Sequence, residues 1–290
     1  MLSILIPTKD YDCHRLVEEL HRQGEKLDCP FEIILGEDGT LPGNLRLNMS
    51  TELLENCRRV IHKKNIGRAN IRNLLAMEAR YRNLLFIDND AVVEKDDFLK
   101  CYVEALKENE VVCGGLYHAA ELPDRECTLR YRYEKKADTT RDAATRSKTP
   151  YKNFTTFNFA IRRDIFISIL FNTSIVDYGY EDTLFGKELE RRGHNIRHID
   201  NMLLHNGLER NAIYLAKVEQ SLMTLKGISR EIGSTPLLDC VDKLRKWHLT
   251  GLFMIYWRWS RKRLRKNLLG NNPSLKKFNI YKLGYYISLT

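Results

Sequence analysis

Short apolar runs alternate with segments of helical periodicity along the first part of the chain, and this pattern constrains the fold more than any other feature. Apolar runs of strand length occupy residues 2–7, 31–36, 83–88 and 110–118. Between them, apolar residues recur every three or four positions, as in residues 13–27, which indicates helices. Buried strands joined by helices form a largely parallel sheet with both faces covered. The sequence therefore predicts an α/β fold.

The chain is expected to contain one large α/β domain and a smaller appendage. We assign the domain to residues 1–210 and a helical extension, rich in basic and aromatic residues, to residues 211–290. Within the domain, residues 123–150 are polar and weakly periodic, which predicts an insertion or a mobile loop. Residues 195–205 are expected to form one further strand.

The excess positive charge of the chain is concentrated near its C-terminus. The net charge is +9, and nine Lys or Arg residues but no Asp or Glu lie between Lys243 and Lys266. The remaining residues are balanced, with 38 basic and 38 acidic side chains. A single local patch favours contact with an anionic lipid surface. It does not resemble the broad basic face of a nucleic-acid-binding protein, so we expect no nucleic acid among the partners.

The basic segment also carries large aromatic residues, including Trp247, Trp257 and Trp259. Its apolar stretch is shorter than the roughly 20 residues that a membrane span needs. Two arrangements are consistent with this composition. The segment could be a helix lying in the interface of an anionic membrane, or a helix packed on the domain with a solvated basic face. The sequence leaves both open.

The cysteines and the first residues bear on the compartment of the protein. Seven cysteines are scattered without a C-x-x-C pair, which is typical of a reduced protein. The start, MLSILIPTKD, lacks the basic region of a signal peptide. We expect a cytoplasmic protein, with the inner face of the cell membrane as the place of any membrane contact.

The stretch LLFIDNDAVV places two aspartates, Asp88 and Asp90, at the tip of a buried strand. Alternate residues of a strand point to the same side, so the two carboxylates can converge. Carboxylate oxygens suit Mg²⁺ or Mn²⁺ bridging to substrate phosphates. A simple turn at the strand end is the alternative, and DYD at residues 10–12 repeats the D-x-D triplet elsewhere. The triplet alone leaves both interpretations open.

Further motifs surround this triplet along the chain. They are SILIPT at residues 3–8, EDGT at 37–40, NIGRANIRN at 65–73, NFAIRRDIF at 158–166, YGYED at 178–182 and LLHNG at 203–207. Each alone has an ordinary structural interpretation, such as a turn at Asp38 or a helix cap at Asn65. In this order they resemble the family 2 glycosyltransferases, which have the GT-A fold. The resemblance implies a Rossmann-like sheet and the inverting transfer of a sugar from a nucleotide sugar.

The resemblance also implies roles for individual residues. Asp90 and His205 would hold Mn²⁺ or Mg²⁺, and Asp182 would be the base that deprotonates the acceptor hydroxyl. The residues implied for the nucleotide-sugar donor, expected to be a UDP-sugar, are Pro7, Thr8, Asp38, Asn65, Arg68, Arg72, Asp88 and Asn89. Those implied for the acceptor, a glycan or a lipid-linked saccharide, are Asn158, Tyr180 and Glu181.

Several alternatives remain at the level of sequence. Asp182 also fits the start of a helix, whose dipole would lower the pKa of this carboxyl and keep it ionised. Arg68 and Arg72 also fit a solvated helix face, and a lone histidine such as His205 is often structural. A protein that binds nucleotide sugars without turnover is the alternative to an enzyme. For the enzyme, we expect a place in bacterial surface polysaccharide synthesis.

Overall fold

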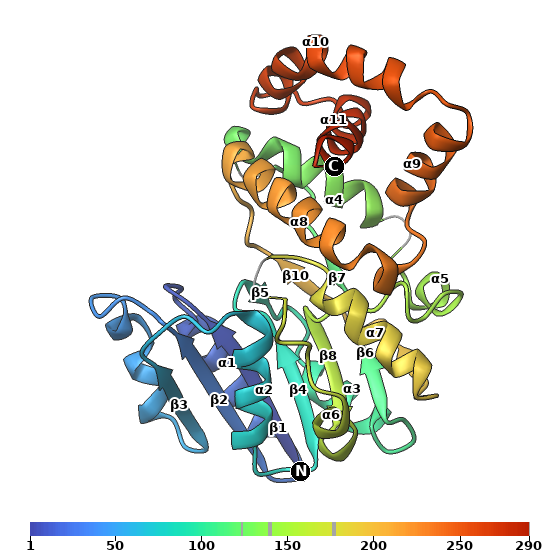
Figure 1. The fold of residues 1–290 in the computed structure, drawn as a ribbon. Helices are drawn as coiled ribbons and strands as arrows, with labels where there is room; N and C mark the ends of the chain where they lie inside the picture. The colour runs from blue at the N-terminus through green and yellow to red at the C-terminus, as the bar shows by residue number, and fades with distance from the viewer. Residues whose placement is uncertain (123, 139–140, 176–177, 290) are drawn as a thin grey trace. The chain divides into compact units, whose positions relative to one another are not determined.

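The computed structural model describes residues 1–122, 124–138, 141–175 and 178–289 (Figure 1). The chain divides into two compact units, and each is described by itself. Unit 1 comprises Met1–Ala119, Asp138–Val176 and Glu181–Gly207, and unit 2 comprises Ala120–Ala137, Asp177–Tyr180 and Leu208–Thr290.

Unit 1 is built on a seven-stranded sheet in the order β3-β2-β1-β4-β8-β6-β9. The strands are β1 (Leu2–Thr8), β2 (Phe31–Asp38), β3 (Cys57–His62), β4 (Asn83–Ile87), β6 (Val111–Cys113), β8 (Asn158–Arg162) and β9 (Ile196–His198). Strand β8 runs antiparallel to both β4 and β6, whereas the other pairs are parallel. The predicted α/β fold with a mainly parallel sheet is confirmed.

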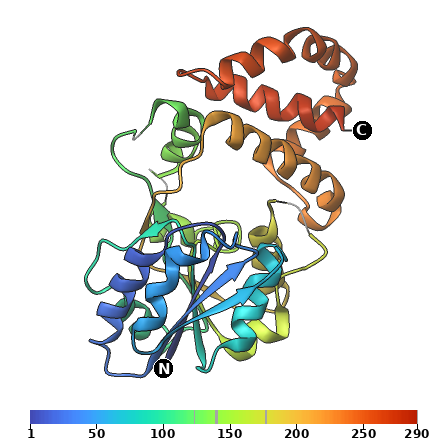
Figure 2. The same ribbon diagram turned by 90° about the vertical axis from the view of Figure 1, so that its left-hand side faces the viewer.

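Helices cover both faces of this sheet, because successive strand residues point to opposite sides. Ile4 and Ile6 of β1 pack in one core with α1 (His14–Gly24) and α3 (Phe98–Ala105). Leu5 packs in the other core, together with residues of α2, α6 and α7. Figure 2 shows α1 and α2 on opposite sides of the strands. The bounds of the remaining helices are α2 (Arg68–Glu78), α6 (Arg163–Ile169), α7 (Glu181–Arg191) and the 3₁₀ helix η1 (Leu45–Leu53).

A small second sheet of unit 1 brings distant segments together. It has the order β5-β10-β7, formed by β5 (Ala91–Val92), β10 (Leu203–His205) and β7 (Leu116–Tyr117). Strand β10 is antiparallel to β5, and His205 lies opposite Ala91. The expectation of one strand over residues 195–205 is wrong, because the chain breaks between β9 and β10, which belong to different sheets.

The polar segment 123–150 is not a loop throughout. It contains η2 (Arg125–Cys127), α4 (Thr128–Asp138) and α5 (Ala143–Ser147), so the alternative of a mobile loop is wrong for these residues, whereas the alternative of an insertion stays a prediction. Helix α4 buries only Thr128 and Leu129, and therefore carries almost no apolar periodicity. Residues 123, 139 and 140 of the predicted loop lie outside the described part of the chain.

Unit 2 is helical from Asn211 onward, as predicted. Its helices are α8 (Asn211–Ile232), α9 (Pro236–Lys246), α10 (Thr250–Leu268) and α11 (Leu275–Ser288). Helices α8, α10 and α11 share a core with Leu129 of α4, in which Trp257 and Phe278 are buried. No helix in the described ranges is long and apolar enough to cross a membrane.

Replacing Gly284 of α11 by alanine should destabilise unit 2. The added Cβ would lie 2.3 Å from Cε3 of Trp257, and such overpacking typically costs about 1–3 kcal/mol of unfolding free energy. The matched control is Gly227→Ala in α8, where an added Cβ meets nothing within 4 Å and alanine favours the helix by up to about 1 kcal/mol. Urea unfolding followed by tryptophan fluorescence measures both variants. Equal stability of the two would contradict the packing shown here.

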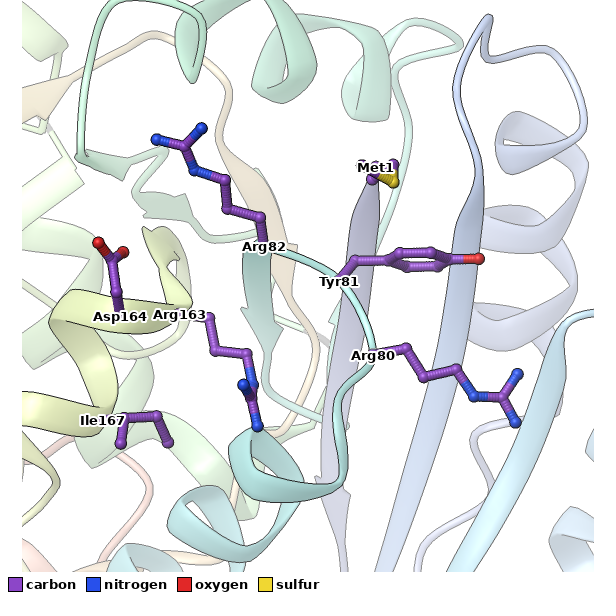
Figure 3. A pocket seen from close by; sticks show the side chains of 7 residues that line it. All are labelled: Met1, Arg80, Tyr81, Arg82, Arg163, Asp164 and Ile167. Carbon is purple, nitrogen blue, oxygen red and sulfur yellow. The ribbon is translucent and has the colours of Figure 1, made fainter.

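A hollow of about 610 Å³ lies at the amino-terminal end of β1 (Figure 3). Its lining includes three arginines, Arg80, Arg82 and Arg163, along with Met1, Tyr81, Asp164 and Ile167. None of the residues predicted to bind donor, acceptor or metal lines it. The chemistry suggested by the sequence belongs to the opposite, carboxyl-terminal end of the parallel strands.

Candidate active site

The first parallel strands of unit 1 end in polar residues at one edge of the sheet. Strand β1 ends at Thr8, β2 at Asp38, and β4 is followed directly by Asp88. Pro7 lies beside Gly36 of β2, and Nδ2 of Asn89 donates to Oγ1 of Thr8 at 3.0 Å. Ligands of open α/β sheets bind outside the carboxyl ends of the strands, so this edge is the place to look for a site.

Asp38 is held by the backbone at the start of α2. Its Oδ1 accepts from the N–H of Ile66 at 2.7 Å, and its Oδ2 accepts from the N–H of Gly67 at 3.0 Å. The turn after β2 needs glycine at position 39, because an added Cβ would lie 2.3 Å from the nitrogen of Asn65. Two charge-assisted hydrogen bonds thus fix the orientation of the Asp38 carboxylate.

Asn65 does not cap α2, so that prediction is wrong. The helix begins at Arg68 with Gly67 in the cap position, and Oδ1 of Asn65 instead accepts from the N–H of Gly67 at 2.9 Å. This bond closes a local turn that ends at Gly67, whose φ is positive.

Arg72 joins helix α2 to the strand end of β4. Its Nη2 donates to Oδ1 of Asp88 at 2.6 Å, and its side chain is 2% exposed. Nε and Nη1 of Arg72 are buried and have no hydrogen-bond partner among the described residues. Arg72 therefore does not lie on a solvated helix face. Arg68, one turn earlier, is exposed and lies 3.9 Å from Glu181.

Asp90 and His205 form a carboxylate–imidazole pair. Oδ2 of Asp90 lies 3.2 Å from Nε2 of His205, which is buried. The antiparallel pairing of β5 and β10 creates this contact across 115 residues of chain, since His205 lies opposite Ala91. The space around the pair requires Gly207, because a Cβ there would lie 1.8 Å from Oδ2 of Asp90. One hard oxygen donor and one imidazole nitrogen fit a divalent cation such as Mn²⁺ or Mg²⁺.

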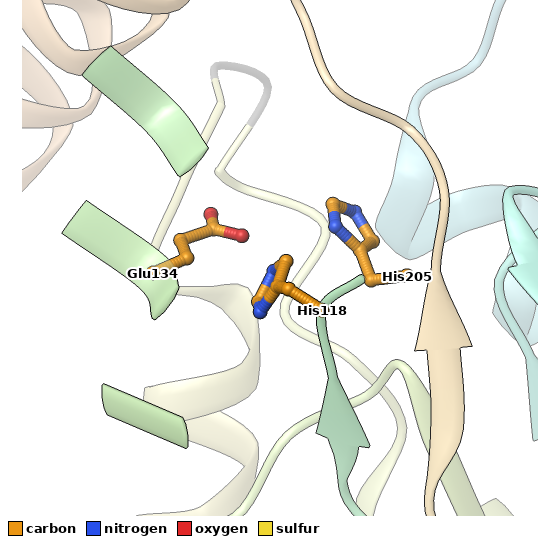
Figure 4. Close-up of side chains that lie close together, drawn as sticks. All are labelled: His118, Glu134 and His205. Carbon is orange, nitrogen blue, oxygen red and sulfur yellow. The ribbon is translucent and has the colours of Figure 1, made fainter. Parts of the chain in front are cut away.

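The His205 ring is held between two other rings. Phe157 and His118 each meet it edge to face, at centroid distances of 5.1 Å and 5.2 Å. His118 lies beside His205 in Figure 4, and Asp138 accepts both its backbone N–H, at 3.0 Å, and its ring Nδ1–H, at 2.9 Å. Sequence reasoning missed His118 and Asp138. The one available signal was that His118, like His205, follows a short apolar strand.

Asp182 lies in the first turn of α7, next to Glu181. Burial and the negative charge of Glu181 raise the pKa of Asp182 to about 6, although the N–H of Thr183 and the charge of Arg72 act in the opposite direction. The expectation that the helix terminus would lower this pKa is therefore wrong, because desolvation outweighs the dipole. A carboxylate with a pKa of about 6 is suited to take a proton near neutral pH.

The residues predicted to bind the acceptor differ in their surroundings. Asn158 is fully buried, and its amide donates to the carbonyls of Gly115 and Asn201 while accepting from the hydroxyl of Tyr102. These bonds give Asn158 a structural role, so its assignment to the acceptor is corrected. Tyr180 belongs to unit 2 and has a positive φ of 70°.

Comparison with known proteins places these features in a family. The model of glycosyl transferase family 2 matches residues 3–170, whereas no curated protein matches the chain. A mannosyltransferase, PcManGT of Pyrobaculum calidifontis, solved with GDP-Man and Mn²⁺, is 18% identical with a TM-score of 0.55, over 81% of this chain and 65% of its own. TarS 1–349 of S. aureus, solved with UDP-GlcNAc, is 16% identical with a TM-score of 0.54, over 79% of this chain and 66% of its own.

A third structure is glucosyl-3-phosphoglycerate synthase of Mycobacterium tuberculosis, solved with Mn²⁺, UDP and phosphoglyceric acid. It is 12% identical with a TM-score of 0.53, over 81% of this chain and 79% of its own. This chain spans slightly less than two thirds of the length of the mannosyltransferase and TarS chains. At these identities the three structures share the GT-A fold with this protein. Since the family model matches more than half of its residues, the chain belongs to glycosyl transferase family 2.

Proposed function

We propose that this protein is a metal-dependent, inverting glycosyltransferase that moves a sugar from a nucleotide-sugar donor to an acceptor hydroxyl. The observation that carries the proposal is the Asp90–His205 pair, 3.2 Å apart. In the same chain, Asp38 and Asp88 lie at the carboxyl ends of β2 and β4, and Asp182 lies in the first turn of α7. Solved proteins with the same fold hold GDP-Man, UDP-GlcNAc or UDP, and two of them hold Mn²⁺.

The donor side of the site follows from the fixed carboxylates. Asp38, oriented by two backbone N–H groups, would accept a hydrogen bond from the base near Pro7 and Thr8. Asp88 would bind the ribose or a metal-bound water, and Arg72 would hold Asp88 in place. Arg72 retains two buried guanidinium nitrogens that a phosphate oxygen can satisfy. Asp90 and His205 would hold a divalent cation, whose positive charge would offset the charge of the leaving diphosphate.

Asp182 would act as the base toward the acceptor. Its carboxylate takes the proton of the acceptor hydroxyl while the hydroxyl oxygen bonds to the anomeric carbon of the donor sugar. The bond from that carbon to the diphosphate oxygen breaks, and the nucleoside diphosphate leaves with the electron pair. One direct displacement inverts the configuration at the anomeric carbon. Glu181, beside Asp182, would bind sugar hydroxyls.

The finer parts of the proposal concern donor and acceptor identity. We expect a UDP-sugar and a glycan or lipid-linked acceptor, in bacterial surface polysaccharide synthesis at the cytoplasmic side of the membrane. The domain assignment made from the sequence, with catalysis in residues 1–210, is part of this proposal. The alternative, a protein that binds nucleotide sugars without turnover, is disfavoured because the metal pair and the raised pKa of Asp182 are both present.

The test is a screen of UDP- and GDP-sugars with Mn²⁺, in which released nucleoside diphosphate and heat of binding are both measured. Turnover of one donor that stops with EDTA supports the proposal. Binding without any turnover, in the presence of candidate acceptors, supports the non-catalytic alternative. Neither binding nor turnover contradicts both.

His118 is predicted to position the metal-binding His205. Replacing it by alanine removes one of the two rings that contact His205, so the orientation of the His205 ring is less fixed and Mn²⁺ affinity should fall. Mn²⁺ binding followed by electron paramagnetic resonance measures the effect without any donor. His194→Ala is the matched control, since this surface histidine pairs with Glu110 at 3.1 Å. Unchanged Mn²⁺ affinity in His118→Ala would rule the role out.

A further inference from the structure

Helix α10 of unit 2 has two different apolar faces. One face is buried: Trp257, Leu264 and Leu268 are spaced by seven and four residues and pack into the core of the unit. This packing is within unit 2 and does not decide between the two arrangements that the sequence left open. It leaves several other apolar residues of the helix exposed to solvent.

The second apolar face forms a ridge on the outside of α10. It consists of Leu252, Ile255, Tyr256 and Trp259, which are 67%, 57%, 49% and 86% exposed. Their spacing of three, four and seven residues places them on one side of the helix. At about 100° per residue, this apolar ridge points away from the buried face around Trp257. Large apolar side chains gathered on one exposed face indicate an interaction site.

The same side of the helix continues as a basic ridge. Lys262, Arg263 and Lys266 follow Trp259 at the helical spacing that keeps them on the side of the apolar ridge. All three are exposed. Nearby, Trp247 is 72% exposed. Of the nine basic residues between Lys243 and Lys266, only Arg245 and Arg265 form ion pairs within the described ranges. The charge of this face is thus largely uncompensated.

We propose that this face of α10 binds the surface of an anionic lipid bilayer. Leu252 and Ile255 would enter the acyl boundary, Tyr256 and Trp259 would lie at the level of the headgroups, and the basic ridge would contact lipid phosphates. The proposal develops the contact with an anionic membrane that the composition of this segment left open, and it does not depend on the transfer chemistry.

Other occupants fit the face less well. A second copy of the chain would bring two basic ridges together, and like charges repel. A nucleic acid would use the basic ridge and could stack on Trp259, but it offers nothing apolar to Leu252 and Ile255. A bilayer surface alone matches both ridges, because its negative headgroups overlie an apolar interior.

The experiment is sedimentation of the full chain with two kinds of liposome. One contains phosphatidylcholine alone, and the other also contains 30 mol% phosphatidylglycerol, about one third of the lipid, which gives a strongly negative surface. Binding is expected with the anionic liposomes and should weaken with salt. The double variant Lys262→Gln/Arg263→Gln should lower the partition constant by roughly 30-fold, at a few-fold per charge. The charge-matched control is Arg258→Gln/Arg261→Gln, on the other sides of the same helix, which should lose no more than a few-fold.

A second pair of variants tests the apolar ridge. Leu252→Ser/Trp259→Ser should abolish sedimentation, whereas Ile213→Ser/Met223→Ser, which removes exposed apolar side chains from α8, should leave it intact. Absence of binding, equal binding to neutral liposomes, or equal loss in variants and controls would overturn the proposal. So would dimerisation or retention of RNA that only the ridge variants lose. Donor turnover, assayed without lipid, reports separately on the proposed function.

Discussion

Replacing Asp90 by alanine is expected to abolish the metal-dependent part of nucleotide-sugar binding. Asp90 supplies a carboxylate oxygen 3.2 Å from Nε2 of His205. Loss of an outer-shell partner already costs about 10- to 100-fold in metal affinity, so loss of a direct ligand should exceed 100-fold. Calorimetry of UDP with and without Mn²⁺ measures the effect. Binding in the absence of metal should stay as in the wild type.

Two further variants make this result specific. Gly207→Ala changes neither Asp90 nor His205, but its added methyl group would collide with Oδ2 of Asp90. This variant should therefore also weaken Mn²⁺ binding. Asp12→Ala changes the other D-x-D triplet, where the Asp12 carboxylate accepts from the N–H of His14. It should bind Mn²⁺ and UDP normally. If Asp90→Ala binds Mn²⁺ as tightly as Asp12→Ala does, the metal assignment is wrong.

Replacing Asp182 by asparagine is expected to leave donor binding intact and to stop transfer. Asparagine keeps the shape of the side chain and cannot accept the proton of the acceptor hydroxyl. General-base catalysis typically contributes about 10²- to 10⁴-fold, so the turnover number should fall by that factor with little change in the affinity for the donor. Equal loss of donor binding in Asp182→Asn and Asp90→Ala would show that the base is misassigned.

The pH profile gives an independent check on Asp182. Because its pKa is raised to about 6, the ionised base is present above that pH and is lost as the pH falls through it. The rate should therefore drop about tenfold per pH unit below pH 6. Glu181→Gln removes the repulsion that helps to raise the pKa, so the acidic limb should move to lower pH. If the acidic limb of Glu181→Gln stays at the same pH, the charge of Glu181 does not help to raise the pKa of Asp182.

The raised pKa also predicts an effect on stability. A carboxyl whose folded pKa lies above its unfolded value binds its proton more tightly in the folded state, so its contribution to stability falls as the pH rises from the unfolded value toward 6. Above that range the folded protein carries a buried charge that asparagine lacks. The melting temperature of Asp182→Asn at pH 7.5, about neutral, should thus exceed that of the wild type. A lower melting temperature would mean that lost transfer reflects damage to the fold.

Local pattern was sufficient for most of the architecture. Apolar runs such as 2–7 and 83–88 form buried strands, as their strand length and apolar character predict from local sequence alone. The helical extension from Asn211 was predictable for the same reason. The local pattern did not predict the helices within residues 123–150, because α4 and α5 form with few buried apolar side chains. It also failed at residues 195–205, where the chain forms two strands that belong to different sheets.

The sequence by itself determined the strand–helix alternation, the order of the motifs, the family they resemble and the basic C-terminal segment. The resemblance already implied that Asp90 and His205 lie close together, and the tertiary structure places them 3.2 Å apart. Only the tertiary structure decided that Arg72 is buried against Asp88 and that Asp138 accepts hydrogen bonds from His118, whose ring packs against His205. It also reversed the expected pKa shift of Asp182. The reason is physical: periodicity and turn chemistry act over a few residues, whereas strand register and desolvation are set by segments that meet only after the chain has folded.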